Sequence, residues 1–222
     1  NRPFLQAIFN HAMDLFRQDK ISQSIQELER LLDYNPHDNQ GVRFIIADLH
    51  FLAGDRKKAE AIYKKNLDYP PYRYSYGLLH FSRQNYARAA KFFRKGIASN
   101  IYISDLLRGK LPIIEYQIWH GSNDELPETA FYYISIMSAK WMEFPEALDL
   151  LDFLHIADPS RSEIEQIYML KQGLYYGESS FGGPGFDDLD MELYDTDMDF
   201  TESFMDFDMN ANSDYDIREE LL

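Results

Sequence analysis

The sequence predicts an all-α fold in which helix–turn–helix units repeat along the chain. Three observations support this prediction. Pro36 and Pro71 stand 35 residues apart, and aligning the chain on them superimposes two similar segments. Four segments share the pattern of a second helix, with apolar residues at helical spacing: 20–36, 55–71, 85–101 and 143–159. Apolar residues make up 45% of the 222 residues, which is enough to bury a sizeable core.

Small residues recur at matching places in the four units. In the second helix of each unit they are Ser24, Ala59, Ala89 and Ala147. In the first helix, where we expect a close approach to a neighbour, they are Ala12, Ala47, Gly77 and Ser135. The turns between the two helices are predicted at 18–20, 54–56, 84–86 and 142–144. We expect Pro71 to close the second helix of its unit, because proline cannot continue a helix.

This combination of a period near 34 residues, small residues at two fixed places, an aromatic residue in the second helix and a closing proline resembles the tetratricopeptide repeat. The resemblance implies a superhelical α-solenoid, because a single hairpin cannot bury its apolar face whereas stacked hairpins can. It places repeats at about 5–38, 39–72, 73–101 and 128–160, with an insert at 102–127. A helix at 161–176 is expected to cap the stack, which completes a repeat domain over residues 1–176.

A more specific resemblance depends on short stretches of the chain. These are Arg2-Pro3, Asn35-Pro36, residues 38–43, residues 105–112 and Gly121-Ser122. Together they are similar to uncharacterised bacterial tetratricopeptide proteins, which are distantly similar to the suppressor-of-tumorigenicity family. This resemblance implies no activity, because those relatives have none assigned.

The concave face of the solenoid is the expected binding surface. In tetratricopeptide proteins the first helix of each unit lines that face. The fifth and ninth positions of the four first helices are Phe9, Met13, Phe44, Asp48, Tyr74, Leu78, Tyr132 and Ile136. They are mostly apolar, unlike the Lys and Asn of family members that hold a peptide carboxylate. We expect a groove for an amphipathic helix or an extended segment; the alternative is that these residues pack in the core.

Nearly all of the net negative charge of the chain lies in its C-terminal part. Residues 178–222 hold 15 Asp and Glu against one basic residue, Arg218, whereas the rest of the chain is near neutral. A glycine-rich linker beginning at residue 177 leads into a segment in which acidic and apolar residues alternate. Such segments resemble disordered activation-type regions. The expected apolar anchors of this tail are Phe200, Phe204 and Phe207.

Three interpretations of the tail remain open. It is a solvated end that aids solubility, a segment that folds on another protein, or a plug that docks in the chain's own groove. The first hypothesis for function is a non-enzymatic protein–protein interaction module, or scaffold, that binds a partner segment in the groove. The alternative is a regulator or adaptor that acts through its tail.

The sequence lacks the motifs of catalysis and cofactor binding. It has no cysteine, which excludes disulfides, thiolate metal sites and a cysteine nucleophile. No G-x-G-x-x-G, G-x-x-x-x-G-K-[ST] or G-x-S-x-G pattern occurs, and no two histidines stand four residues apart. Asp195, Asp197 and Asp199 resemble the start of an EF-hand loop, but Phe200 stands where that loop requires glycine. We therefore expect no enzyme activity, no cofactor and no metal site.

Charge and hydropathy argue against nucleic acids and membranes as partners. A basic run in the second unit is interpreted as a solvated helix face; it consists of Arg56, Lys57, Lys58, Lys64 and Lys65. Nucleic-acid binding is not expected, because the acidic tail would compete for these residues. The sequence has no run of about 18 apolar residues, so no membrane-spanning segment is expected. We expect a cytoplasmic protein whose partner is a protein or peptide.

Overall fold

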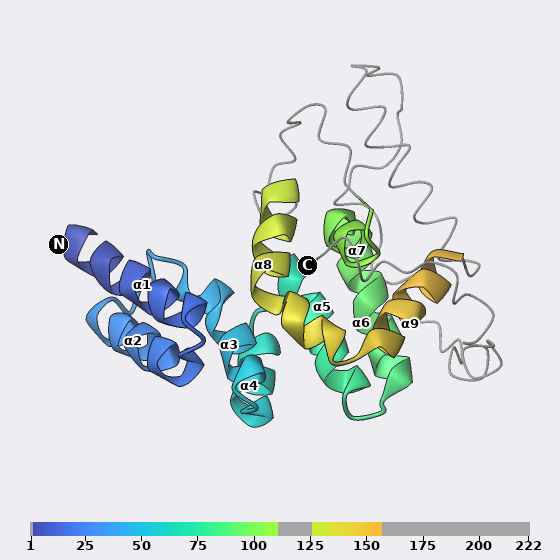
Figure 1. The fold of residues 1–222 in the computed structure, drawn as a ribbon, viewed down its shortest axis with the longest axis horizontal. Coiled ribbons are helices and arrows are strands. Elements are labelled where there is room, and N and C mark those ends of the chain that lie inside the picture. Colours follow the sequence, from blue (N-terminus) through green and yellow to red (C-terminus); the bar gives the residue numbers. More distant parts are fainter. Residues whose placement is uncertain (1, 111–125, 157–222) are drawn as a thin grey trace, which may run out of the picture.

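The computed structural model describes residues 2–110 and 126–156, and all regular structure within them is helical (Figure 1). The all-α repeat fold is therefore confirmed. The elements in chain order are α1 (Arg2–Arg17), α2 (Ile21–Tyr34), the 3-10 helix η1 (Val42–Phe44), α3 (Ile46–Leu52), α4 (Arg56–Tyr63), α5 (Pro70–Phe81), α6 (Tyr86–Ser99), α7 (Ile101–Leu107), α8 (Pro127–Met142) and α9 (Pro145–Ile156). The predicted helix 161–176 and the tail 177–222 lie outside the described residues, as does 111–125 of the predicted insert.

Four helical hairpins follow one another: α1–α2, α3–α4, α5–α6 and α8–α9. The predicted turns separate the helices of each pair. In three of these turns one residue takes a left-handed backbone conformation: Asp19, Gly54 and Gln84, with φ of 60°, 82° and 59°. Asp55 and Asn85 then cap the following helices, because their side chains accept hydrogen bonds from the backbone N–H groups of Lys58 and Arg88.

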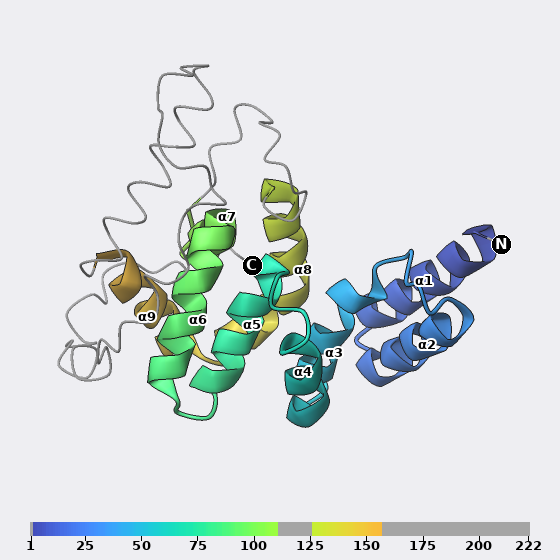
Figure 2. The ribbon, with the colours of Figure 1, turned by 180° about the vertical axis from the view of Figure 1, so that it is seen from behind.

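The hairpins stack in sequence, and α8 adds a brace across the stack. The α1–α2 hairpin lies at one end of the molecule, as both views show (Figures 1 and 2). Between hairpins, α2 packs on α3 and α4 packs on α5, while α6 packs on both α7 and α9. Helix α8 packs on α7 and also on α3 and α5, so it links the fourth hairpin to the second and third. These contacts place α8 next to the first helices of two other units.

Small residues permit this packing where the sequence predicts them. A Cβ atom on Gly77 would lie 2.5 Å from the Phe93 ring, so only glycine fits between α5 and α6 at this point. The alanines at the corresponding places are fully buried: Ala12, Ala47, Ala59, Ala89 and Ala147. Ser135 is an exception, because its side chain is exposed and its hydroxyl donates to the Tyr132 carbonyl. The expected close approach at Ser135 is therefore wrong.

The role of Pro71 also differs from the expectation. Helix α4 already ends at Tyr63, and a succession of turns leads to Pro70. Pro70 and Pro71 occupy the first turn of α5, where a missing backbone N–H costs nothing and the fixed φ suits a helix. The proline therefore opens the third unit instead of closing the second.

Candidate functional site

The eight residues predicted to line the groove divide by exposure. Five are buried in the core: Met13, Asp48, Tyr74, Leu78 and Ile136. Phe9 and Phe44 are half-buried and pack against that core, and Tyr132 is 38% exposed. A partner in this conformation can therefore reach Phe9, Phe44 and Tyr132, whereas the five buried side chains belong to the packing beneath them.

Tyr132 is exposed because the fourth unit is displaced by one residue from the predicted register. In α5 the buried pair at the fifth and ninth positions is Tyr74 and Leu78. In α8 Tyr133 and Met137, which are four residues apart like the pair in α5, are buried at 2% and 0% exposure. Adjacent helical residues differ by about 100° in direction, so Tyr132 is turned outward while Tyr133 points into the core.

A chain of buried polar groups lies beneath the predicted groove. The Tyr63 hydroxyl of α4 donates to Asp48 Oδ1 of α3 at 2.7 Å. Ser75 of α5 donates to the Tyr133 hydroxyl at 3.1 Å, and Trp141 Nε1 of α8 donates to the same oxygen at 2.8 Å. These groups tie together the four helices on which the site is built.

Asp48 is the electrostatic centre of this chain of groups. Burial raises the pKa of its carboxyl group from 3.8 to about 7, although side-chain hydrogen bonding with Ser75 and Tyr63 partly opposes the shift. Burial and then the Asp48 charge raise the pKa of the Tyr63 and Tyr133 hydroxyls. The tyrosines therefore stay neutral donors and acceptors, and Asp48 is the member that titrates near neutral pH.

The exposed face of α8 carries no charge over most of its length. From Phe131 to Met142 its outward-facing residues are Phe131, Tyr132, Ser135, Ser138, Ala139 and Met142. Phe131 is 42% exposed and Met142 is 52% exposed. The one charged residue within this stretch, Lys140, is buried and pairs with Glu143 at 2.8 Å. Surface helices usually carry charged residues on the solvent side, so this α8 face resembles an interface.

Basic groups flank the α8 face and the neighbouring aromatic residues. Arg17 at the end of α1 lies close enough to Tyr132 to lower the pKa of its hydroxyl, against the larger effect of burial, which raises it. The guanidinium of Arg43 lies over the Phe44 ring at 4.4 Å, and that ring contacts Tyr69 with 4.6 Å between centroids. The aromatic residues are thus accompanied by cations on the α1 and η1 sides.

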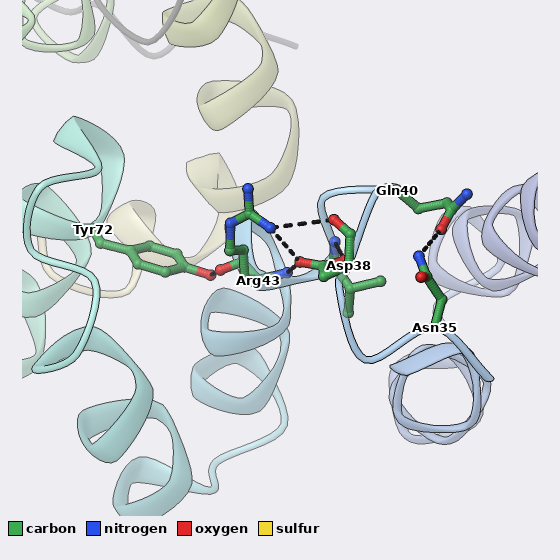
Figure 3. A network of polar contacts seen from close by, with 6 residues as sticks. Asn35, Asp38, Gln40, Arg43 and Tyr72 are labelled. Atoms are coloured by element: carbon green, nitrogen blue, oxygen red, sulfur yellow. Dashed lines mark hydrogen bonds and ion pairs between the residues drawn. The ribbon is translucent and has the colours of Figure 1, made fainter. Parts of the chain in front are cut away.

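A polar network around Asp38, Arg43 and Tyr72 holds Arg43 in place (Figure 3), and with it the adjacent Phe44. The Asp38 carboxylate accepts hydrogen bonds from the backbone N–H groups of Val42 and Arg43 at 2.7 and 2.8 Å, which caps η1. Arg43 Nη1 also lies 3.2 Å from this carboxylate, and the Tyr72 hydroxyl donates to the Arg43 carbonyl. The position of Phe44 is therefore fixed from both the α2 side and the α5 side.

The sequence analysis did not predict that Phe131 and Met142 are exposed apolar residues of the candidate site. It assigned the face of α8 from positions counted in the other three units, and a displacement of one residue changes which side chains point outward. The absence of charge between Glu128 and Lys140 is visible in the sequence. A long helix with so little charge is the signal that could have identified α8 as unusual.

The described part of the chain offers no arrangement typical of a catalytic or metal site. Within residues 2–110 and 126–156, no three His, Asp or Glu side chains gather as a metal site would require. The Ser104 hydroxyl lies 2.7 Å from His155 Nε2, but Ser104 is fully buried and therefore not placed to attack a substrate. No helix in these ranges is both long and apolar enough to span a membrane.

Comparison with known families agrees with the geometry of the hairpins. Residues 9–72, from the middle of α1 to the first turn of α5, match the tetratricopeptide repeat model. This segment carries tetratricopeptide repeats. No curated protein and no solved structure gave a match. Tetratricopeptide repeats generally mediate protein–protein interactions and are non-catalytic modules, and the stacked helical hairpins have that architecture.

Proposed function

We propose that this chain is a non-enzymatic interaction module that binds an apolar segment of a partner protein on the exposed face of α8. The observation that carries the proposal is the uncharged stretch from Phe131 to Met142, which stays exposed although the opposite side of α8 is buried. Apolar patches of this kind on a folded protein are typical of protein-binding surfaces. Tyr132 is the one predicted groove residue that belongs to this face.

The adjoining residues define what kind of segment fits. Phe9 and Phe44 extend the aromatic surface on the α1 and η1 sides, and Arg17 and Arg43 lie beside it, each already paired with one carboxylate, that of Asp14 or Asp38. Aromatic anchors favour a segment that has apolar residues, and the remaining N–H groups of the two arginines can accommodate a carboxylate at its edge. An amphipathic helix or an extended strand of that composition satisfies both requirements.

Paired substitutions on the full chain test this proposal. A displayed library of random peptides is selected against the full chain, and the dissociation constant of an enriched peptide is measured by fluorescence anisotropy. We expect Phe131→Ser with Tyr132→Ser to weaken that peptide at least tenfold. Phe4→Ser with Tyr34→Ser is the matched control, because these two exposed aromatics contact each other on the first hairpin with 5.9 Å between ring centroids. Equal loss in both variants, or no enriched peptide, would contradict the proposal.

A second candidate function depends on the tail, which lies outside the described residues. The alternation of acidic residues with the anchors Phe200, Phe204 and Phe207 favours a regulator or adaptor that acts through this segment. In that case Phe200→Ser, Phe204→Ser and Phe207→Ser together would abolish partner binding, and the α8 substitutions would leave it unchanged. A tail that instead blocks the α8 face would make the triple variant bind the selected peptide more tightly.

A further inference from the structure

A basic ridge runs along the exposed side of α4 and reaches the adjoining end of the α5–α6 hairpin. Its members are Arg56, Lys57, Lys64, Lys65, Arg83 and Arg88. Burial and then the charges of Arg88, Arg83 and Lys64 lower the pKa of His80 to about 4, although Glu60 opposes them. These three cations therefore gather at the same end of α5, although they come from α4, from the turn after α5 and from α6.

The ridge holds more positive charge than its own carboxylates neutralise. Glu60 pairs with both Lys64 and Arg83 at 2.7 Å, and these partners lower the pKa of Glu60 to about 2. The other four ridge residues have no carboxylate within ion-pair distance in the part of the chain that the structure describes: Arg56, Lys57, Lys65 and Arg88. All four are exposed, so the ridge presents free cations to an anionic partner.

We propose that the acidic segment 187–208 of this same chain docks on the basic ridge. This segment has ten Asp and Glu and no Lys or Arg. Residues 56–95, which include the ridge, have eleven Lys and Arg against two Asp and Glu. The two segments therefore carry large formal charges of opposite sign, −10 and +9, and attract each other.

The covalent connection favours docking within one molecule. Helix α9 packs on α6, which carries Arg88, and the chain continues from the end of α9 at Ile156. Thirty residues separate Ile156 from Asp187. The ten linker residues 177–186 span about 17 Å as a flexible chain, and the expected helix 161–176 would add about 24 Å, whereas a 14-residue helix such as α6 is roughly 21 Å long. A tethered segment with this reach acts at an effective concentration on the order of millimolar.

The ridge and the exposed face of α8 are separate surfaces. The ridge belongs to α4, the C-terminal end of α5 and the N-terminal end of α6. The α8 face runs from Phe131 to Met142. A tail held on the ridge leaves the α8 face free for a partner. It also masks the free cations of the ridge, so that nucleic acids and other polyanions meet a neutralised surface.

The full chain allows a direct test, because it has no native cysteine and each label can be placed on an introduced one. Ala61, which is exposed on α4 between Lys57 and Lys65, is changed to Cys together with Ser203→Cys in the tail. Spin labels on these cysteines report their distance by pulsed electron spin resonance. We expect a population shorter than about 30 Å at low salt, and at least a fivefold loss of it in 0.5 M NaCl, because salt screens exposed charges.

Charge variants test whether the basic ridge is the surface that holds the tail at short distance from α4. Lys57→Glu, Lys65→Glu and Arg88→Glu together should remove the short distances, and the three neutral Gln substitutions should reduce them. Arg2→Glu, Lys20→Glu and Arg30→Glu, on the exposed side of the first hairpin, make the same charge change and should preserve them. Circular dichroism establishes that every variant stays folded.

Three outcomes would overturn the docking proposal. The first is an absence of short distances at low salt, or their survival in the ridge variant. The second is short distances that vanish when labelled chain is diluted with unlabelled chain, which would place the segment on a second copy. The third is a tail label close to Ser138→Cys on α8 but not to Ala61→Cys, which would place the tail on the proposed partner surface. None of these outcomes depends on whether α8 binds a peptide.

Discussion

The Tyr63 hydroxyl donates a 2.7 Å hydrogen bond to Asp48 at the point where α3, α4, α5 and α8 meet. Because burial raises the pKa of Asp48 from 3.8 to about 7, folding favours the protonated carboxyl group. The unfolded chain releases this proton near pH 4, whereas the folded chain keeps it until about pH 7. The contribution of Asp48 to stability is therefore fully present below pH 4 and is lost as the pH rises through 7.

We predict that Asp48→Asn removes the loss of stability that the ionisation of Asp48 causes as the pH rises. Asn keeps an oxygen that accepts from Tyr63 and does not ionise. Relative to the native chain, the variant should gain about 4 kcal/mol in free energy of unfolding between pH 4 and pH 8, since one pKa unit corresponds to about 1.4 kcal/mol. Urea unfolding at several pH values measures this difference. Histidine contributions are common to both chains and cancel, so a pH-independent difference would contradict the raised pKa.

The fold was predictable from the sequence because the pattern that identifies a helical hairpin recurs within each unit. Small residues and turn residues recur at one period, and stacking neighbours is the way such hairpins bury their apolar faces. The environment of Asp48 was not predictable in this way. Its buried surroundings include Tyr63, Ser75 and Tyr133, which are brought together only by the placement of α8 after the third hairpin.

We predict that Gly77→Ala destabilises the chain although alanine is the better helix former. The propensity gain is about 1 kcal/mol. The added Cβ would lie 2.5 Å from the Phe93 ring and 3.3 Å from the Ala89 carbonyl oxygen, and overpacking of this kind costs about 1–3 kcal/mol. The net loss should therefore be about 1 kcal/mol in chemical denaturation.

Phe93→Leu provides the control for this substitution. If the ring causes the clash, Gly77→Ala in the Phe93→Leu background should cost less than in the native chain. Equal costs in the two backgrounds would show that the Phe93 ring is not the obstacle.

We predict that Asp38→Ala lowers the free energy of unfolding by about 2–4 kcal/mol, because it leaves the backbone N–H groups of Val42 and Arg43 without their acceptor. Asp38→Asn keeps one acceptor oxygen and should cost less. Asn also tolerates the positive φ of 50° at this position. Thermal unfolding compares the two, with Asp33→Ala on the exposed side of α2 as the control. A larger loss from Asn than from Ala would contradict the capping role.

We predict that His155 makes the chain sensitive to acid. Burial, followed by the charges of Arg108 and Lys110, lowers the pKa of its imidazole to about 3. Its contribution to stability is therefore full above pH 6.5 and is lost as the pH falls toward 3. His155→Gln can still bond to Ser104 but does not titrate, so its melting temperature should rise relative to the native chain between pH 7 and pH 4. His37→Gln, at an exposed site, is the control substitution.

The candidate site shows where sequence reasoning fails for a physical reason. Tyr132 and Tyr133 are chemically identical neighbours, and the one that faces solvent depends on the rotation of α8 about its axis. Ile101 stands where the repeat pattern would place a third proline, and the insert 102–127 interrupts the period before the fourth unit, so counting from the earlier units does not fix its register. The rotation is set instead by packing of α8 on α3, α5 and α7, which are distant in the sequence.

The brace made by α8 concentrates packing in one part of the molecule. Helix α8 packs on α3, α5 and α7, whereas the α1–α2 hairpin joins the next unit chiefly through α2, with Glu29 pairing to Lys58 at 3.2 Å. Such an exposed ion pair contributes little to stability. A partner that touches only α8 therefore meets a surface supported by three other helices. One that also reaches Phe9 spans the α2–α3 joint, and any ordering of that joint on binding lowers its affinity per unit of contact area.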